Sequence, residues 1–257
     1  MKLIDALVSA APAIASIRRD LHAHPELCFH EQRTADVVAA QLTQWGIPVH
    51  RGMGTTGVVG IVKAGTSNRA IGLRADMDAL PMQEFNTFAH ASQYAGKMHA
   101  CGHDGHTAML LAAAQRLAEE GGFDGTLNLI FQPAEEGGGG ALKMMEDGLF
   151  EQFPCDAIFA MHNMPGHPQG QLIFRAGPMM ASSDYATITL HGVGGHGAMP
   201  HRATDPVVAA ASVIMALQTV VSRNTDPLQP AVVTVGAVHA GQANNVIPAT
   251  ARLELSV

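Results

Sequence analysis

The sequence has few cysteines and no concentration of basic residues. Its three cysteines, Cys28, Cys101 and Cys155, are far apart in a chain of 257 residues. An odd number of widely separated cysteines does not suit a disulfide framework and favours a reducing compartment, so we expect an intracellular, cytoplasmic protein. The formal charge is -7 with no block of Lys and Arg. This excludes the basic stripe that nucleic acid or an anionic membrane would require.

Long apolar runs and an export signal are also lacking. We expect no apolar run that approaches the ~20 residues that a membrane-spanning helix needs. The first 21 residues include Lys2 and apolar residues, as a signal peptide does, but Asp5 interrupts them and the apolar positions follow helical spacing. We therefore expect a soluble protein with neither a membrane nor a nucleic-acid partner.

Apolar patterns predict alternating helices and strands through most of the chain. Helices are expected at residues 1–21, 31–46, 104–122 and 138–150, and strands at 55–65, 69–78, 125–136 and 155–165. This alternation indicates an α/β domain in which a mostly parallel sheet is buried between flanking helices. We place this domain at residues 1–178.

The pattern changes near Gly177. Residues 186–195, 205–223, 231–240 and 249–257 are predicted to form a strand, a helix and two further strands. We expect a second, smaller α+β domain at residues 179–257, with its last strand near an unprotected sheet edge.

The stretch "MHACGHDGHT", residues 98–107, holds three histidines, a cysteine and an aspartate. One interpretation is a polar loop in which Asp104 or Thr107 caps the following helix. A second is a cysteine nucleophile at Cys101 with a nearby base. A third is a metal site.

The metal interpretation gains support from the residues that follow the predicted strands. Ligands of open α/β sheets bind beyond the carboxyl ends of the strands. Asp76 and Asp78, Glu135 and Glu136, and His162 come after the apolar runs of three such strands. Cys101, His103, Glu136 and His162 would together offer sulfur, nitrogen and oxygen ligands, a set that suits Zn²⁺, with Mn²⁺ as an alternative.

The adjacent carboxylates in "QPAEE" support the same hypothesis. Neighbouring carboxylates repel each other, and a cation relieves this repulsion. If Glu136 binds metal, Glu135 is free to act as a general base, and Asp78 is expected to orient a ligating imidazole. The alternative is a solvated acidic pair at the start of a helix, where the helix dipole favours negative charge.

Six motifs occur in order along the chain: "RADMDALP", "MHACGHDGHT", "FQPAEEGGGGA", "MHNMP", "GGHGAMPH" and "NVIP". They resemble those of the M20 metallopeptidases, above all the amidohydrolase branch of hippurate hydrolases, N-acyl-amino-acid amidohydrolases and auxin-conjugate hydrolases. The resemblance implies a centre of two divalent ions, Zn²⁺ or Mn²⁺ with Co²⁺ or Ni²⁺ as alternatives. It assigns Cys101, His103, Glu136 and His162 as ligands, Glu135 as the general acid and base, and Asp78 as its supporting carboxylate.

The resemblance also implies a substrate and a partner. The expected reaction is metal-dependent hydrolysis of the amide bond of an N-acyl amino acid by an activated water. The second domain is expected to be a lid that joins a homodimer. His196 would reach into the partner's site, and Asn245 would lie near the substrate carboxylate.

One departure from the family concerns the carboxyl-terminal side of the chain. Family members continue beyond the position of Val257 and carry a late histidine that serves as the last metal ligand. We therefore expect a fragment or a shortened product, and the alternative function is an inactive or weakly active fragment that binds metal or dimerises.

Overall fold

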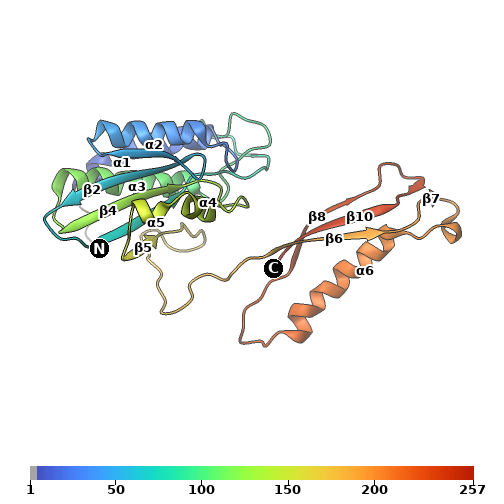
Figure 1. Cartoon of the computed structure of the whole chain (residues 1–257). Helices are drawn as coiled ribbons and strands as arrows, with labels where there is room; N and C mark the ends of the chain where they lie inside the picture. Colours follow the sequence, from blue (N-terminus) through green and yellow to red (C-terminus); the bar gives the residue numbers. More distant parts are fainter. Residues whose placement is uncertain (1–4) are drawn as a thin grey trace. The chain divides into compact units, whose positions relative to one another are not determined.

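The computed structural model describes residues 5–257, and the chain divides into two compact units, Met1–Pro168 and Gln169–Val257. Each unit has a sheet and an apolar core of its own (Figure 1). The division falls shortly before the boundary expected after residue 178.

A five-stranded sheet forms the centre of the first unit, in the order β1-β2-β4-β3-β5. The strands are β1 (Val49–Met53), β2 (Gly57–Ala64), β3 (Ala70–Asp76), β4 (Gly125–Gln132) and β5 (Ala157–Ala160). β3 is parallel to β4 and β5, whereas β2 is antiparallel to β1 and β4. The α/β class is confirmed, but the sheet is mixed rather than mostly parallel.

The departure from a parallel sheet arises at β1 and β2. Only residues 54–56 connect these strands, and so short a connection joins antiparallel strands because a parallel pair needs a much longer crossover. The sequence did not predict β1, whose side chains are mostly exposed and form no apolar run. The predicted site residues follow the parallel strands β3, β4 and β5.

Helices cover both faces of this sheet, as expected. They are α1 (Asp5–Ala23), α2 (Gln32–Gln44), α3 (His103–Glu120), α4 (Gly140–Glu146) and α5 (Leu149–Gln152). Neighbouring side chains of a strand point to opposite faces. Accordingly, Leu129 and Phe131 of β4 pack in the core cluster that includes α2 and α3, whereas Ile130 packs in a second cluster with Met144 of α4.

The second unit contains a three-stranded antiparallel sheet in the order β6-β10-β8. Its elements are β6 (Tyr185–His191), β7 (Gly195–His196), η1 (Pro200–Arg202), α6 (Pro206–Thr219), η2 (Val220–Asn224), β8 (Thr234–Ala240), β9 (Val246–Ile247) and β10 (Thr250–Ser256). The predicted strand, helix and two strands are all present. The placement of the last strand was wrong: β10 is the central strand, because β6 and β8 pair with its two edges.

Helix α6 is more apolar than expected. With η2 it forms a stretch of 19 residues, Pro206–Asn224, that is long and apolar enough to cross a membrane by length and composition alone. The expectation that no such stretch exists is therefore wrong, since scattered polar residues such as Ser212 and Gln218 hardly lower its apolar character. One such helix is a weak indication of a membrane span. α6 packs Ala210 against Leu253 and Leu255 of β10, and the absence of a membrane partner stays a prediction.

Phe131 provides a test of the core of the first unit. Its side chain is fully buried in β4, so Phe131→Ala should lower the free energy of unfolding by about 3–5 kcal/mol through lost apolar burial and a cavity. Phe85, which is 89% exposed, is the matched control. Phe85→Ala should change the free energy of unfolding by less than about 0.5 kcal/mol. Urea denaturation measures both values, and equal losses in the two variants would contradict this core assignment.

Candidate metal centre

The predicted site residues of the first unit converge at one edge of its sheet. Because β3, β4 and β5 are parallel, their carboxyl ends lie at the same edge. Cys101, His103 and His162 offer ligand atoms that all lie within 4.8 Å of one another, as do His103, Glu135 and Glu136. His103 belongs to both groups and is therefore central to the cluster.

The His103 ring is held on one side and free on the other. Nδ1 lies 3.2 Å from Asp78 Oδ1, which makes it the donor of a hydrogen bond to that carboxylate. Nε2 is buried, 3.7 Å from Glu136 Oε1 and 3.8 Å from Glu135 Oε2, and has no hydrogen-bond partner among residues 5–257. A histidine whose Nδ1–H is fixed by a carboxylate presents the lone pair of Nε2, which is the usual arrangement of a metal ligand.

His162 follows the same pattern. Its Nδ1 donates to the carbonyl of Asn163 at 2.7 Å, and its Nε2 lies 3.4 Å from Cys101 Sγ. The Asn163 N–H donates to His106 Nε2 at 3.0 Å, and His106 Nδ1 lies 2.6 Å from Asp76 Oδ1. The loop that carries His162 is therefore tied to α3 and β3 through His106.

Asp78 connects three parts of the site. Besides His103, its carboxylate accepts the backbone N–H of Glu136 at 2.9 Å and the thiol of Cys28 at 3.3 Å. Burial opposes ionisation of Asp78, but the hydrogen bonds from His103 and the backbone outweigh burial and lower its pKa. Asp78 therefore stays charged and fixes the positions of His103 and Glu136 relative to each other.

The pKa values of the cluster reflect an excess of negative charge. Burial, reinforced by Glu136 and Glu135, raises the pKa of the Cys101 thiol to about 12. Burial also raises the pKa of Glu136; His103 opposes this rise and Glu135 adds to it. For His103, burial lowers the pKa, but the surrounding carboxylates prevail and raise it.

The donor atoms fit divalent ions. His103 Nε2 and Glu136 Oε1 are both buried, and neither has a hydrogen-bond partner within the described part of the chain. Buried polar atoms are rarely left unpaired without a reason. Together with Cys101 and His162 they supply the nitrogen, sulfur and oxygen donors expected of a zinc-type site. A third group, Asp76 with His103 and His106, is less suited, because Asp76 and His106 already bond each other.

The alternative interpretations of this region fit the structure less well. α3 begins after Gly102 without a side-chain cap, so neither Asp104 nor Thr107 has the capping role. A cysteine nucleophile at Cys101 would have His162 Nε2 at 3.4 Å as its base, but it would give no role to Glu135 and Glu136 beside His103. The acidic pair does not lie at a helix start either, since α4 begins only at Gly140.

A second buried polar network lies beside the cluster, and the sequence analysis did not find it. His22 Nδ1 contacts Asp104 Oδ2 at 2.9 Å, and His22 Nε2 contacts Glu84 Oε1 at 3.2 Å. Arg18 Nε donates to the same Asp104 oxygen at 3.0 Å. These partners are more than 60 residues apart in the sequence, so no local pattern could have linked them.

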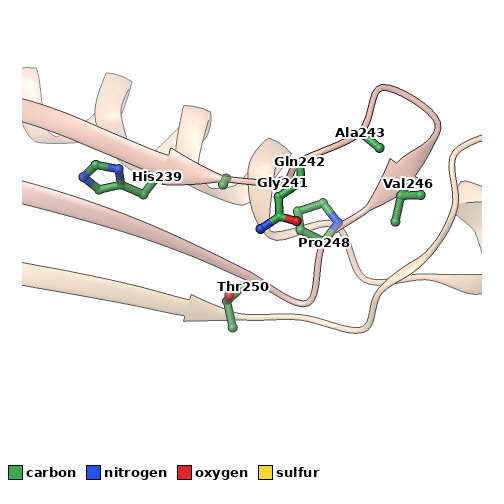
Figure 2. Close-up of a pocket in the computed structure, with 8 residues that line it drawn as sticks. His239, Gly241, Gln242, Ala243, Val246, Pro248 and Thr250 are labelled. Carbon is green, nitrogen blue, oxygen red and sulfur yellow. The ribbon is translucent and has the colours of Figure 1, made fainter.

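His196 and Asn245 belong to the second unit, where the small β7-β9 ribbon brings their segments together. His196 pairs with Val246 across the ribbon, and the N–H of Gly197 donates to the Asn245 carbonyl at 2.8 Å. Both side chains are exposed. A hollow at the connection from β8 to β10 is lined by residues that include His239, Gln242 and Thr250 (Figure 2), and none of the predicted site residues lines it.

Comparison with known proteins decides the family. A model of "Peptidase family M20/M25/M40" matches residues 72–251. The chain belongs to the M20 peptidase family. It is 50% identical to a hippurate hydrolase from Campylobacter jejuni over 257 residues, which are 100% of this chain and 67% of that protein. It is 43% identical to an N-acetyl-L-cysteine deacetylase from Bacillus subtilis, over 95% of this chain and 58% of that protein.

Solved structures agree with this M20 assignment. The chain matches YxeP of Bacillus subtilis, described as a dinuclear metal-binding peptidase of the M20 family, with a TM-score of 0.72 and 37% identity over 97% of this chain and 64% of that one. The predicted family resemblance is confirmed. This M20 chain spans about three fifths to two thirds of the length of these relatives.

His22 provides a test of the second buried network through pH. The hydrogen bond with Asp104 raises the pKa of His22; burial opposes the rise and Glu84 adds to it. The stabilisation is therefore fully present below the unfolded pKa of about 6.5 and is lost as the pH rises through the folded pKa. His22→Gln should cost about 2 kcal/mol of unfolding free energy at pH 6 and less at pH 9.

Denaturation of wild type and variant at both pH values measures this difference. His167→Gln, which changes an exposed imidazole of the same unit, is the control and should have little effect at either pH. A cost of His22→Gln that stays constant from pH 6 to pH 9 would show that the imidazole is not charged in the folded protein.

Proposed function

We propose that the chain forms the metal centre of an amidohydrolase that cleaves the amide bond of N-acyl amino acids. One observation carries the proposal. His103 Nε2 and Glu136 Oε1, two atoms that can bind a metal, are buried 3.7 Å apart near Cys101 and His162, and neither has a hydrogen-bond partner among the described residues. The similarity to a hippurate hydrolase and an N-acetyl-L-cysteine deacetylase supports an N-acyl amino acid as the substrate.

Four side chains would hold the ions: Cys101, His103, Glu136 and His162. Two divalent ions, Zn²⁺ or Mn²⁺, would supply polarisation of the scissile carbonyl and a lowered pKa of the attacking water. Asp78 would keep His103 Nε2 directed at the site through its bond to Nδ1.

Glu135 is suited to move the proton. Its side chain is 43% exposed while its neighbour Glu136 is largely buried, so Glu135 can meet water and substrate. We propose that Glu135 accepts the proton of the attacking water and then donates it to the leaving amine. The products are a carboxylate and a free amino acid.

The second unit would contribute to substrate binding and to assembly. We propose that Asn245 contacts the substrate carboxylate and that His196 serves the site of a second copy in a homodimer. The β7-β9 ribbon joins the segments of His196 and Asn245, which supports a shared role in substrate binding. We also propose a cytoplasmic location.

Glu135→Gln and Glu136→Gln form a matched pair that tests the division of roles. Glu135→Gln should reduce glycine release from benzoylglycine by the Mn²⁺-loaded protein ~10² to 10⁴-fold, because a proton carrier is lost, and should leave metal content nearly unchanged. Glu136→Gln should lower metal content as well. Metal content is measured by plasma emission after gel filtration, and metal loss in Glu135→Gln would reverse the two assignments.

Cys101→Ser tests the thiolate ligand. A hydroxyl does not ionise readily enough to replace a thiolate, so the variant should bind Zn²⁺ roughly 10-fold or more weakly, a loss typical of altered metal sites. Cys155→Ser is the control, because the Cys155 thiol lies near the Phe153 carbonyl outside the cluster. Equal Zn²⁺ affinity in both variants would remove Cys101 from the ligand set. Activity that survives chelation but not thiol alkylation would instead favour a cysteine hydrolase.

A further inference from the structure

Three described residues other than glycine have left-handed backbone conformations: Phe29 with φ 61°, Thr55 with φ 82° and Ala134 with φ 50°. This conformation is unfavourable for residues with a Cβ atom and persists only where the surroundings hold it. The three residues come from separate parts of the sequence, yet Phe29 and Ala134 are partners of one side chain, that of Glu31, and Thr55 precedes its third partner, Thr56.

Glu31 receives three hydrogen bonds. Its Oε1 accepts the N–H groups of Phe29 at 3.0 Å and Ala134 at 2.8 Å. Its Oε2 accepts the hydroxyl of Thr56, which follows Thr55 directly, at 2.6 Å. One carboxylate therefore connects the segment before α2, the turn before β2 and the loop after β4.

The burial of Glu31 is costly and is not explained by its own helix. The side chain is 0% exposed, and no cation pairs with it among residues 5–257. Burial accordingly raises its pKa, although the hydrogen bond from Thr56 opposes the rise. Glu31 precedes α2 without capping it by its side chain. Burial of a carboxylate costs free energy unless hydrogen bonds compensate for it, and all three compensating bonds of Glu31 come from segments outside α2.

The loop that Glu31 holds has little freedom. A Cβ atom on Gly138 would lie 2.6 Å from Ala134 Cβ and 2.7 Å from Phe29 Cε2, so these segments pack in direct contact. The N–H of Gly140 donates to the Ala134 carbonyl at 3.0 Å. Ala134 is therefore bonded through both its N–H and its carbonyl, immediately before the Glu135–Glu136 pair.

We propose that Glu31 is a positioning residue that fixes the left-handed backbone at Ala134 and so sets where Glu135 and Glu136 stand opposite His103. Glu31 holds the N–H of Ala134, and Asp78 holds the N–H of Glu136, so the acidic pair is fixed from both ends. The inference rests on the proposed function only for the roles that it gives to Glu135 and Glu136.

Glu31→Met is the main test, and Glu26→Met is its matched control. Methionine has nearly the length of glutamate but no oxygen acceptor, so it leaves the N–H groups of Phe29 and Ala134 without their partner. Glutamine would be a weaker test, because its carbonyl could still accept these N–H groups while its NH₂ donates to the Thr56 hydroxyl. The Glu26 carboxylate likewise accepts three bonds, from the N–H of Arg33 and the N–H and hydroxyl of Thr34. These bonds hold the start of α2 and do not reach the loop at residues 133–140.

Two measurements on the 257-residue protein separate positioning from general stability. Co²⁺ titration should show ~10 to 100-fold weaker binding for Glu31→Met, as for other residues that orient metal ligands, and an unchanged affinity for Glu26→Met. Hydrogen exchange of the metal-free protein should accelerate at residues 133–140 in Glu31→Met only. Thr56→Val, which removes one of the three bonds and keeps the carboxylate, should show a smaller change of the same kind, and it replaces Glu31→Met as the test where that variant does not fold.

Ala134→Gly provides a rescue experiment. Glycine adopts positive φ without a Cβ penalty, so adding Ala134→Gly to Glu31→Met should recover part of the lost Co²⁺ affinity. Equal effects of Glu31→Met and Glu26→Met, or unchanged exchange at residues 133–140 in Glu31→Met, would overturn the proposal. A wild-type protein that binds no Co²⁺ would refute the metal centre, whereas the exchange comparison would still decide the role of Glu31.

Discussion

The gathering of four carboxylates around one buried imidazole is the constraint on which the first unit depends. Carboxylate oxygens lie within 3.8 Å of a ring nitrogen of His103, from Asp76, Asp78, Glu135 and Glu136. Like charges at such distances raise each other's free energy, and one imidazolium cannot neutralise them all. The repulsion between these carboxylates lowers the stability of the fold, and bound divalent cations would offset it.

The scaffold meets this constraint with fixed hydrogen bonds and with one further cation, since Arg74 Nη1 lies 2.7 Å from Asp76 Oδ2. Asp78 and Asp76 each orient a histidine, and Asp78 and Glu31 each accept a backbone N–H of the loop that carries Glu135 and Glu136. Such bonds hold ligands in place before a metal arrives, which limits the reorganisation that binding requires. Glu135, whose side chain is 43% exposed, keeps the freedom that its proposed role as a proton carrier requires.

The two units divide the functional residues between them. Every predicted metal ligand lies in the first unit, near the carboxyl ends of its parallel strands β3, β4 and β5. His196 and Asn245 lie in the second unit, on a ribbon too short to have a core of its own. That ribbon depends on the β6-β10-β8 sheet, whose central strand β10 is covered by α6.

Local patterns in the sequence determined the α/β class, the order of most elements and the residues that crowd the strand ends. Apolar periodicity is local, so α3, β4 and the strand, helix and two strands of the second unit could be predicted. The pairing of strands is not local: the antiparallel β1 and the central place of β10 depended on which edges were available. The same holds for the network of His22, Asp104 and Glu84 and for the bonds of Glu31. Their partners lie far apart in the sequence, and only the tertiary structure decided that they meet.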